Sequence, residues 1–109
     1  VIVLDSGEQV QALAVIVATG AAPRNLNVPG EETYWGVGVS ACSICDCFMA
    51  QDKDVVIVGG GDSAAEHALN LNGYAKSLTI LVRGEKMRAS NRMQEKLRNY
   101  PNIRVLYGI

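Results

Sequence analysis

The sequence has few cysteines, little net charge and no long apolar run, and each shortage excludes a class of protein. Three cysteines in 109 residues are too few for a disulfide-dense secreted scaffold, which has an even number of four or more. A net charge of −1 gives no basic field for nucleic acid or anionic lipid. No run approaches the ~18 apolar residues that a membrane span needs. The 49% of hydrophobic residues excludes a disordered tail.

The two ends of the sequence bear on its domain organisation. The length suits one small domain. However, the chain starts with Val1 inside an apolar, strand-like run and ends on Ile109 directly after another. We therefore expect the chain to be part of a larger protein, which also leaves room for a targeting segment before Val1.

The first third of the chain predicts two strands and a linker. Val1–Asp5 is a short β-rich run, followed by turn residues at 5–8. Leu13–Ala18 is apolar on both faces, as is a strand buried in a parallel sheet. The stretch Ala22–Gly38 contains two prolines and three glycines and lacks a sustained period. It is typical of a linker.

After the linker, strands and helices alternate. Apolar runs predict strands at Val55–Val58, Leu78–Val82 and Ile103–Tyr107. Helical spacing of apolar residues predicts helices at Asp62–Leu71 and Asn91–Asn99. This alternation predicts an α/β fold, a Rossmann-like parallel sheet with right-handed crossover helices.

A glycine-rich motif joins the first of these strands to the first helix. The sequence Gly59-x-Gly61-x-x-Ala64 follows a strand and opens a helix, which is the context that a dinucleotide-binding fingerprint requires. Gly59 permits the tight turn, Gly61 lets a pyrophosphate approach the backbone, and Ala64 packs closely on the strand. The helix N-terminus offers free N–H groups to the phosphates. The alternative is an ordinary glycine-rich turn, which this context makes the weaker interpretation.

Charged residues after the next strand favour NADP over NAD. An NAD site usually carries an acidic residue at the end of the second strand, but here Arg83 follows Val82, with Arg88 five positions later. Two guanidinium groups suit a 2′-phosphate. Glu85 lies between them and could reach a ribose hydroxyl, and a solvated charged loop is the simpler alternative.

Three cysteines lie together in Cys42-Ser43-Ile44-Cys45-Asp46-Cys47. A C-x-x-C at the start of a helix is typical of a redox dithiol, because the helix end favours the thiolate. Asp46 could supply and take up protons as the dithiol cycles. Half of a zinc site is a second possibility, but it needs two more ligands, and His67 is the only histidine. Buried structural thiols are the third.

Taken together, these residues resemble the low-molecular-weight thioredoxin reductases, which are two-domain flavoproteins. The resemblance extends over nearly the whole chain, in family order. The matching segments are Ala18-Thr19-Gly20-Ala21, Pro29-Gly30-Glu31, Gly38-Val39-Ser40-Ala41-Cys42-Ser43-Ile44-Cys45-Asp46, Gly59-Gly60-Gly61-Asp62-Ser63-Ala64-Ala65-Glu66 and Val82-Arg83-Gly84-Glu85-Lys86-Met87-Arg88-Ala89-Ser90.

The resemblance implies roles for individual residues. Cys45 would face the flavin, Cys42 would attack the disulfide of thioredoxin, and Asp46 would be the general acid. Cys47 stands where the family usually has glycine, so it has no implied role. The residues implied in cofactor binding are Gly59, Gly61, Asp62, Ser63, Ala64, Arg83 and Arg88 for NADPH, and Thr19 and Gly20 on the return from the FAD domain.

The resemblance also implies the organisation of the whole protein. Residues 1–38 would be the end of an FAD-binding domain and the linker, and residues 39–109 a partial NADPH-binding domain. Electrons would pass from NADPH to FAD, to Cys42–Cys45 and to thioredoxin, in a homodimer. Independently of the resemblance, a redox pair beside an NADP-type site favours a cytoplasmic location, and the low net charge and lack of a long apolar run favour no nucleic-acid or membrane partner. This piece alone would be inactive. The alternatives are a nucleotide-binding module without redox activity and a similar NADH-dependent peroxiredoxin reductase, against which the two arginines argue.

Overall fold

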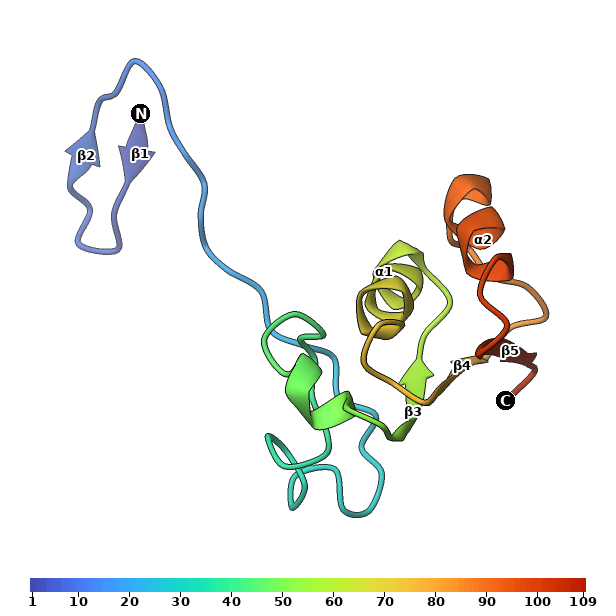
Figure 1. The fold of residues 1–109 in the computed structure, drawn as a ribbon. Helices are drawn as coiled ribbons and strands as arrows, with labels where there is room; N and C mark the ends of the chain where they lie inside the picture. Colours follow the sequence, from blue (N-terminus) through green and yellow to red (C-terminus); the bar gives the residue numbers. More distant parts are fainter.

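The computed structural model describes all residues from Val1 to Ile109. A short hairpin comes first, and a region of alternating strands and helices follows it (Figure 1). The elements in chain order are β1 (Ile2–Val3), β2 (Gln9–Val10), the 3₁₀ helix η1 (Cys47–Ala50), β3 (Asp54–Val58), α1 (Asp62–Leu71), β4 (Ser77–Val82), α2 (Asn91–Arg98) and β5 (Ile103–Tyr107).

The predicted parallel sheet is confirmed. Its strand order is β3-β4-β5, and both pairs run parallel. Val55 is paired with Leu78, which in turn is paired with Ile103. These runs of β-branched and large apolar residues favour strands, and each predicted strand and helix in this region lies within one residue of its predicted bounds. The fold class is therefore α/β.

The two helices cover one face of this sheet. They lie side by side on the same side of the strands (Figure 1). A hydrophobic cluster of 13 residues fills the space between the helices and the sheet, and all 13 residues come from positions 50–97. Leu78 and Ile80 of the central strand have no exposed surface. Ala65 and Ala68 are also fully buried, and their small size lets α1 approach the sheet closely.

The opposite face of the sheet is open. Val56, Val58 and Leu106 project from it and remain 60%, 51% and 39% exposed. Successive side chains of a strand point to opposite faces, so the apolar runs seen in the sequence have only one of their two faces covered.

The first two predicted strands differ from the structure. Val1–Asp5 contributes the two-residue strand β1, and the predicted turn is present, with the Leu4 N–H donating to the Glu8 carbonyl at 2.9 Å. The strand that pairs with β1 is β2, which the sequence did not indicate. The buried strand predicted at Leu13–Ala18 is wrong: this segment belongs to no sheet, and Leu13, Ile16 and Val17 are 110%, 92% and 80% exposed. A strand needs a hydrogen-bonding partner, and no other segment of this chain pairs with it.

The stretch Ala22–Gly38, predicted as a linker, contains no helix or strand but is locally ordered. The Glu31 carboxylate is buried and accepts the backbone N–H groups of Leu26 and Asn27 at 2.9 and 2.7 Å. Farther on, an isolated bridge joins Trp35 to Val39. This part of the chain is a set of hydrogen-bonded turns, and only the segment before it is fully extended (Figure 1).

The molecule as a whole is elongated. Its radius of gyration is 18.3 Å, whereas a compact domain of 100 residues has about 13 Å. The hairpin lies away from the helices and the sheet, at the end of the extended segment (Figure 1). None of the helices has the length and hydrophobicity required to cross a membrane.

Candidate functional site: a glycine loop and a disulfide joined by one helix

The glycine loop adopts the geometry that its motif predicts. Gly59 has φ of +144°, a conformation that L side chains rarely adopt. A Cβ at Gly59 would lie 3.1 Å from the Cβ of Ala64, which is itself buried. A Cβ at Gly61 would meet no atom within 4 Å, so the surface above Gly61 is open. A pyrophosphate group fits here, because it can approach the backbone beside the first N–H groups of α1.

The sequence motif gave no role to Gly60, yet the structure uses this residue twice. A Cβ at Gly60 would lie 2.8 Å from Cγ1 of Val82, so β4 passes too close for any side chain here. The Gly60 carbonyl also accepts the backbone N–H groups of Arg88 and Ala89, at 2.6 and 3.0 Å. Gly60 therefore joins the glycine loop to residues 83–90, which we call the arginine loop.

Asp62 makes a second connection between the two loops. One of its carboxylate oxygens accepts the backbone N–H of Ser90 at 2.8 Å. Ser63 is exposed beside it in the first turn of α1. The structure thus places Asp62 as a residue that holds the arginine loop against the N-terminus of α1.

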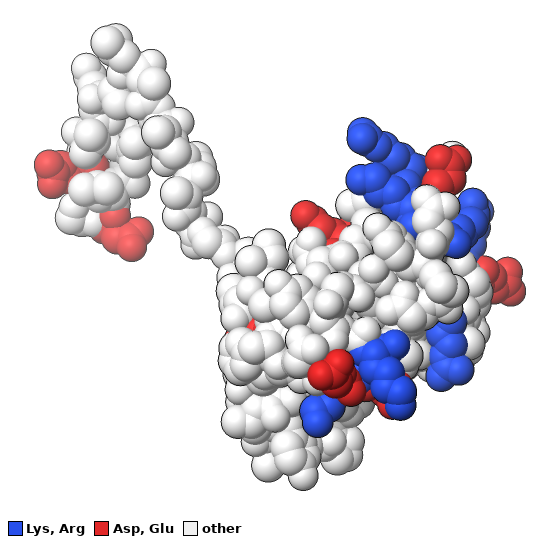
Figure 2. Space-filling model, in the orientation of Figure 1, with Lys and Arg blue, Asp and Glu red and all other residues white.

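The two arginines of this loop are free to bind an anion. Arg83 and Arg88 are both exposed, and the single ion pair of the chain joins Lys76 to Asp54, at 3.9 Å. Glu85 therefore does not neutralise either guanidinium group. Figure 2 shows lysine and arginine side chains gathered over the part of the molecule that holds α2. The exposed guanidinium groups of Arg83 and Arg88, which have no acidic partner, suit a phosphate group.

The two cysteines of the C-x-x-C form a disulfide. Cys42 and Cys45 are joined, with 5.3 Å between their Cα atoms. Cys42 is half-buried and Cys45 is exposed. The expectation that the pair opens an α-helix is wrong: the cysteines lie in turns, and only the four-residue 3₁₀ helix η1 follows. Asp52 then takes a left-handed conformation, φ +56°, just before β3.

Ser40 organises the residues around the disulfide. Its hydroxyl donates to a carboxylate oxygen of Asp46 and accepts the backbone N–H of Cys42 at 3.0 Å. Because of these two contacts, the carboxylate of Asp46 is held on the side of the loop where Cys42 begins. Ser40 was not among the predicted site residues, since a serine two positions before a cysteine carries no specific signal.

Ser43, between the two cysteines, is buried and contacts α1. Its Oγ lies 2.7 Å from Nδ1 of His67 and accepts a hydrogen bond from Nδ2 of Asn70 at 3.2 Å. The Ser43 hydroxyl therefore links His67 of α1 to the loop that contains the two cysteines. His67 and Asn70 are 24 and 27 residues from Ser43, so sequence spacing could not reveal these contacts.

The chain contains no group of three or more His, Cys, Asp or Glu side chains that could hold a metal ion.

The remaining predicted residues lie apart from this arrangement. Cys47 is a free thiol, half-buried at the start of η1, where it packs against the hydrophobic cluster. Thr19 and Gly20 lie exposed on the extended segment, with Gly20 at φ +75°. These two residues form no cradle, so this chain by itself does not fit FAD.

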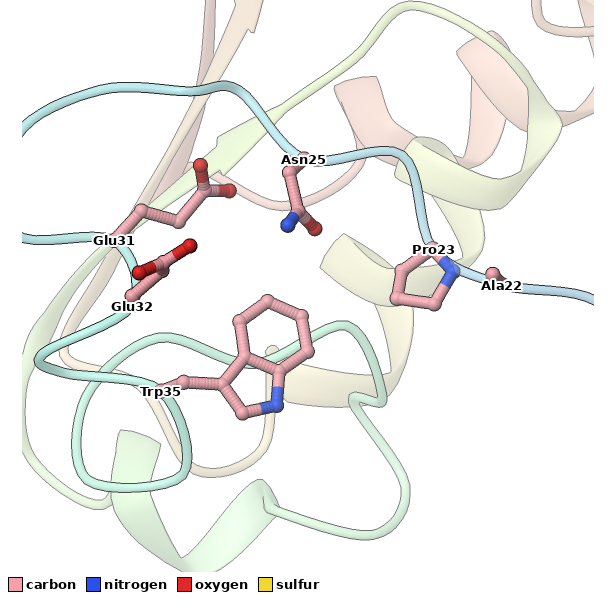
Figure 3. A pocket seen from close by; sticks show the side chains of 6 residues that line it. All are labelled: Ala22, Pro23, Asn25, Glu31, Glu32 and Trp35. Atoms are coloured by element: carbon pink, nitrogen blue, oxygen red, sulfur yellow. The ribbon is translucent and has the colours of Figure 1, made fainter.

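A pocket of about 390 Å³ lies within the linker and contains none of the predicted site residues. Figure 3 shows its lining side chains, with Trp35 facing the carboxylates across the opening. The Glu31 carboxylate already accepts two backbone N–H groups, so it stabilises the local turn. The lining residues are Ala22, Pro23, Asn25, Glu31, Glu32 and Trp35.

Comparison with known proteins gives a consistent result. A family model described as pyridine nucleotide-disulphide oxidoreductase matches residues 1–108. A thioredoxin reductase of Penicillium chrysogenum is 51% identical over 97 residues, covering 87% of this chain and 29% of that protein. Mitochondrial thioredoxin reductase 2 of Saccharomyces cerevisiae is 45% identical over 106 residues, covering 95% of this chain and 31% of that protein.

A solved structure extends the similarity to the fold. Thioredoxin reductase from Giardia duodenalis matches with a TM-score of 0.82 and 45% identity, covering 94% of this chain and 33% of that chain. The chain thus spans about a third of the length of the relatives that it matches. It belongs to the pyridine nucleotide-disulphide oxidoreductase family, within which it is similar to part of the low-molecular-weight thioredoxin reductases.

Proposed function

We propose that this chain carries the redox disulfide and the NADPH site of an NADPH-dependent thioredoxin-disulfide reductase. One observation supports this most directly: the Cys42–Cys45 loop and the glycine loop are both attached to α1, the first through Ser43 and the second at the helix N-terminus. A disulfide and a dinucleotide site on one small body are what a pyridine nucleotide-disulphide oxidoreductase requires.

The disulfide is the group that we propose exchanges with thioredoxin. Once two electrons and two protons have converted Cys42–Cys45 to a dithiol, the Cys42 thiolate attacks the thioredoxin disulfide and forms a mixed disulfide. The Cys45 thiolate then attacks Sγ of Cys42, which restores the bond and releases reduced thioredoxin. Asp46 is the group that we propose gives and takes the protons, and its hydrogen bond to Ser40 beside this loop supports that role.

NADPH is the cofactor that we propose for the glycine loop and the arginine loop. The pyrophosphate would lie above Gly61 at the N-terminus of α1, with Gly59 and Ala64 shaping the turn. Arg83 and Arg88, which have no acidic partner, would hold the 2′-phosphate. Asp62 and Ser63 would complete the site, Asp62 through its bond to the arginine loop.

The other features of the whole protein are proposals that rest on its relatives. FAD, which in the proposed enzyme relays electrons between NADPH and the disulfide, would be held mainly by the part of the relatives' length that this chain does not cover, with Thr19 and Gly20 at its margin. Residues 1–38 would then be the end of the FAD domain and the linker, and 39–109 part of the NADPH domain. We also propose a cytoplasmic homodimer.

The decisive experiment replaces each cysteine in the full-length protein and measures NADPH-dependent reduction of thioredoxin. Cys42→Ser and Cys45→Ser should each abolish turnover, because either change removes the disulfide. Cys47→Ser is the matched control and should retain turnover, since Cys47 is a free thiol outside the pair. Persistent turnover in the Cys42 and Cys45 variants would show that the proposed role of the dithiol is wrong.

A companion measurement tests the chain of 109 residues by itself. Mixed with NADPH, FAD and thioredoxin, it should produce no thiols, because Thr19 and Gly20 form no flavin cradle. Turnover by this chain would contradict the division of the flavin site that we propose. Stoichiometric zinc in elemental analysis would instead support a structural metal site and count against the redox function.

Arg83 tests the choice of nucleotide. In the full-length protein, Arg83→Ala should raise KM for NADPH about tenfold or more while changing KM for NADH little, because only NADPH carries the 2′-phosphate that a charge-assisted pair would bind. Arg92→Ala, an exposed change of equal charge on α2, is the control. An unchanged NADPH-to-NADH ratio would remove Arg83 from the site.

A further inference from the structure

Ser43 is the one residue of the C-x-x-C that is buried. It is 8% exposed, whereas Ile44 beside it is 73% exposed and Cys45 is also exposed. The serine side chain turns into the molecule toward the middle of α1, while its neighbours face outward. A buried hydroxyl group requires hydrogen-bond partners to offset the loss of water.

Both partners of Ser43 come from one helix. His67 Nδ1 lies 2.7 Å from the serine Oγ, and Asn70 Nδ2 donates to the same oxygen at 3.2 Å. Positions three apart on a helix share a face, so His67 and Asn70 form a two-point clamp around one atom. A serine hydroxyl has one proton and two lone pairs. With Asn70 as a donor, the serine can give its proton to a neutral imidazole at Nδ1.

We propose that His67 and Asn70 are positioning residues for the redox disulfide. They fix Ser43, and Ser43 fixes the loop that holds Cys42 and Cys45 at the 5.3 Å Cα separation of the bonded pair. The inference rests on the proposed function only in taking this disulfide as the redox centre. Without the clamp, the loop of the reduced form samples more conformations, and the two thiols meet less often.

The consequence is a change in the equilibrium between the disulfide and the dithiol. In a glutathione buffer, two molecules of reduced glutathione convert the Cys42–Cys45 disulfide to two thiols and become one molecule of oxidised glutathione, so electrons and protons balance. A clamp that favours the bonded geometry raises the concentration of reduced glutathione needed for half reduction. Removing it makes the disulfide easier to reduce.

The experiment measures this equilibrium on the chain of 109 residues, by trapping free thiols at graded ratios of reduced to oxidised glutathione. A Cys47→Ser background leaves only the pair under study. His67→Ala should lower the equilibrium constant for disulfide formation about fivefold, the effect of one lost hydrogen bond, and Ser43→Ala, which removes the bonds to both His67 and Asn70, should lower it at least as much. The double variant should lose no more than Ser43→Ala alone, because the serine change already removes the contact with His67.

Two variants separate the hydrogen bond from simple packing. His67→Asn keeps a polar atom one bond beyond Cγ, where Nδ1 lies, and should recover most of the native equilibrium constant. Glu66→Ala changes an exposed neighbour on the same helix and should leave it unaltered. Equal losses in His67→Asn and His67→Ala, or additive losses in the double variant, would overturn the proposal.

This test stands apart from that of the proposed function. It uses no NADPH, FAD or thioredoxin, so an enzyme with a different substrate would still show the shift. Conversely, if the full-length protein reduces thioredoxin but Ser43→Ala has a native equilibrium constant, the clamp is refuted and the proposed function still holds. If circular dichroism shows that His67→Ala does not fold, Asn70→Ala replaces it in the test. Asn70→Ala deletes the second hydrogen bond to Ser43 and should also lower the equilibrium constant for disulfide formation. A native equilibrium constant in Asn70→Ala would equally refute the clamp.

Discussion

At the scale of single residues, Gly60 shows how a position in a loop is constrained by a distant strand. A Cβ on Gly60 would meet Cγ1 of Val82 at 2.8 Å. Val82 is buried and β-branched, so its side chain has little freedom to move away. The glycine is therefore required by packing, without any need for an unusual backbone conformation at this position.

Gly60→Ala should consequently lower the free energy of unfolding of the chain by about 1–3 kcal/mol, the usual cost of overpacking a tight interior. Urea titration followed by circular dichroism measures it. Gly73→Ala is the matched control, because a Cβ there would meet no atom within 4 Å. A loss no greater than that of the control would show that β4 and the glycine loop move apart easily.

The same residues show what the sequence could predict. Gly59 and Gly61 follow from a motif whose glycines have known backbone roles, and the structure shows a positive φ at Gly59 and open space above Gly61, while their part in nucleotide binding stays a prediction. The cysteine pair also follows from its spacing. Gly60, Ser40 and Ser43 do not, because their importance comes from Val82, Asp46 and His67, and only the fold brings Val82 and His67 close. Motifs report local chemistry, whereas these contacts depend on tertiary structure.

At the scale of secondary-structure elements, the N-terminus of α1 holds the arginine loop in place. The connection consists of two bonds to the Gly60 carbonyl and one from the Ser90 N–H to Asp62. The loop that follows β4 therefore does not depend on its own short sequence for its position. The bond from its backbone N–H to the Gly60 carbonyl places Arg88 next to the glycine loop, where we propose that the nucleotide binds.

Asp62→Ala should weaken NADPH binding about five- to tenfold, because the arginine loop loses one of its three bonds to the glycine loop and the first residue of α1, the one to a charged acceptor. Asp62→Asn retains an oxygen for the Ser90 N–H and should stay within about twofold of the native Kd. Calorimetric titration of the chain with NADPH measures both. An equally large loss in Asp62→Asn would indicate that the negative charge, rather than the bond, is what matters.

Elements were predicted well where each had a partner within the chain. The strands at positions 54–58, 77–82 and 103–107 and both helices lie where the apolar pattern places them. The pattern at Leu13–Ala18 is as strong, yet no strand forms there, because hydrophobicity shows that a segment suits a sheet but not which strand pairs with it. The expected α-helix at the cysteine pair is also absent, and turns followed by the 3₁₀ helix η1 take its place.

At the scale of the whole molecule, the extended segment divides the chain into unequal parts. Arg24 is the first lysine or arginine in the sequence, and it lies exposed close to that segment. Residues 1–23 offer trypsin no cleavage site. The later basic residues lie among the helices, strands and turns of the folded region, where the backbone is hydrogen-bonded.

Brief treatment with trypsin should therefore cut first after Arg24, because a protease needs an extended, accessible backbone. Mass spectrometry should show a transient product of residues 25–109 with an intact Cys42–Cys45 disulfide. Arg24→Gln should remove this product and slow the first cleavage. An initial cut within residues 83–88 would show that the arginine loop opens more readily than its bonds to Gly60 and Asp62 imply.

The confinement of the hydrophobic cluster to positions 50–97 has a thermodynamic consequence. The heat-capacity change of unfolding follows the apolar surface that becomes exposed, at about 12–15 cal/mol/K per residue in compact domains. In this chain the hairpin and the extended segment are already hydrated before unfolding. Its calorimetric transition should thus correspond to a protein much shorter than 109 residues, with a shallow dependence of unfolding enthalpy on temperature.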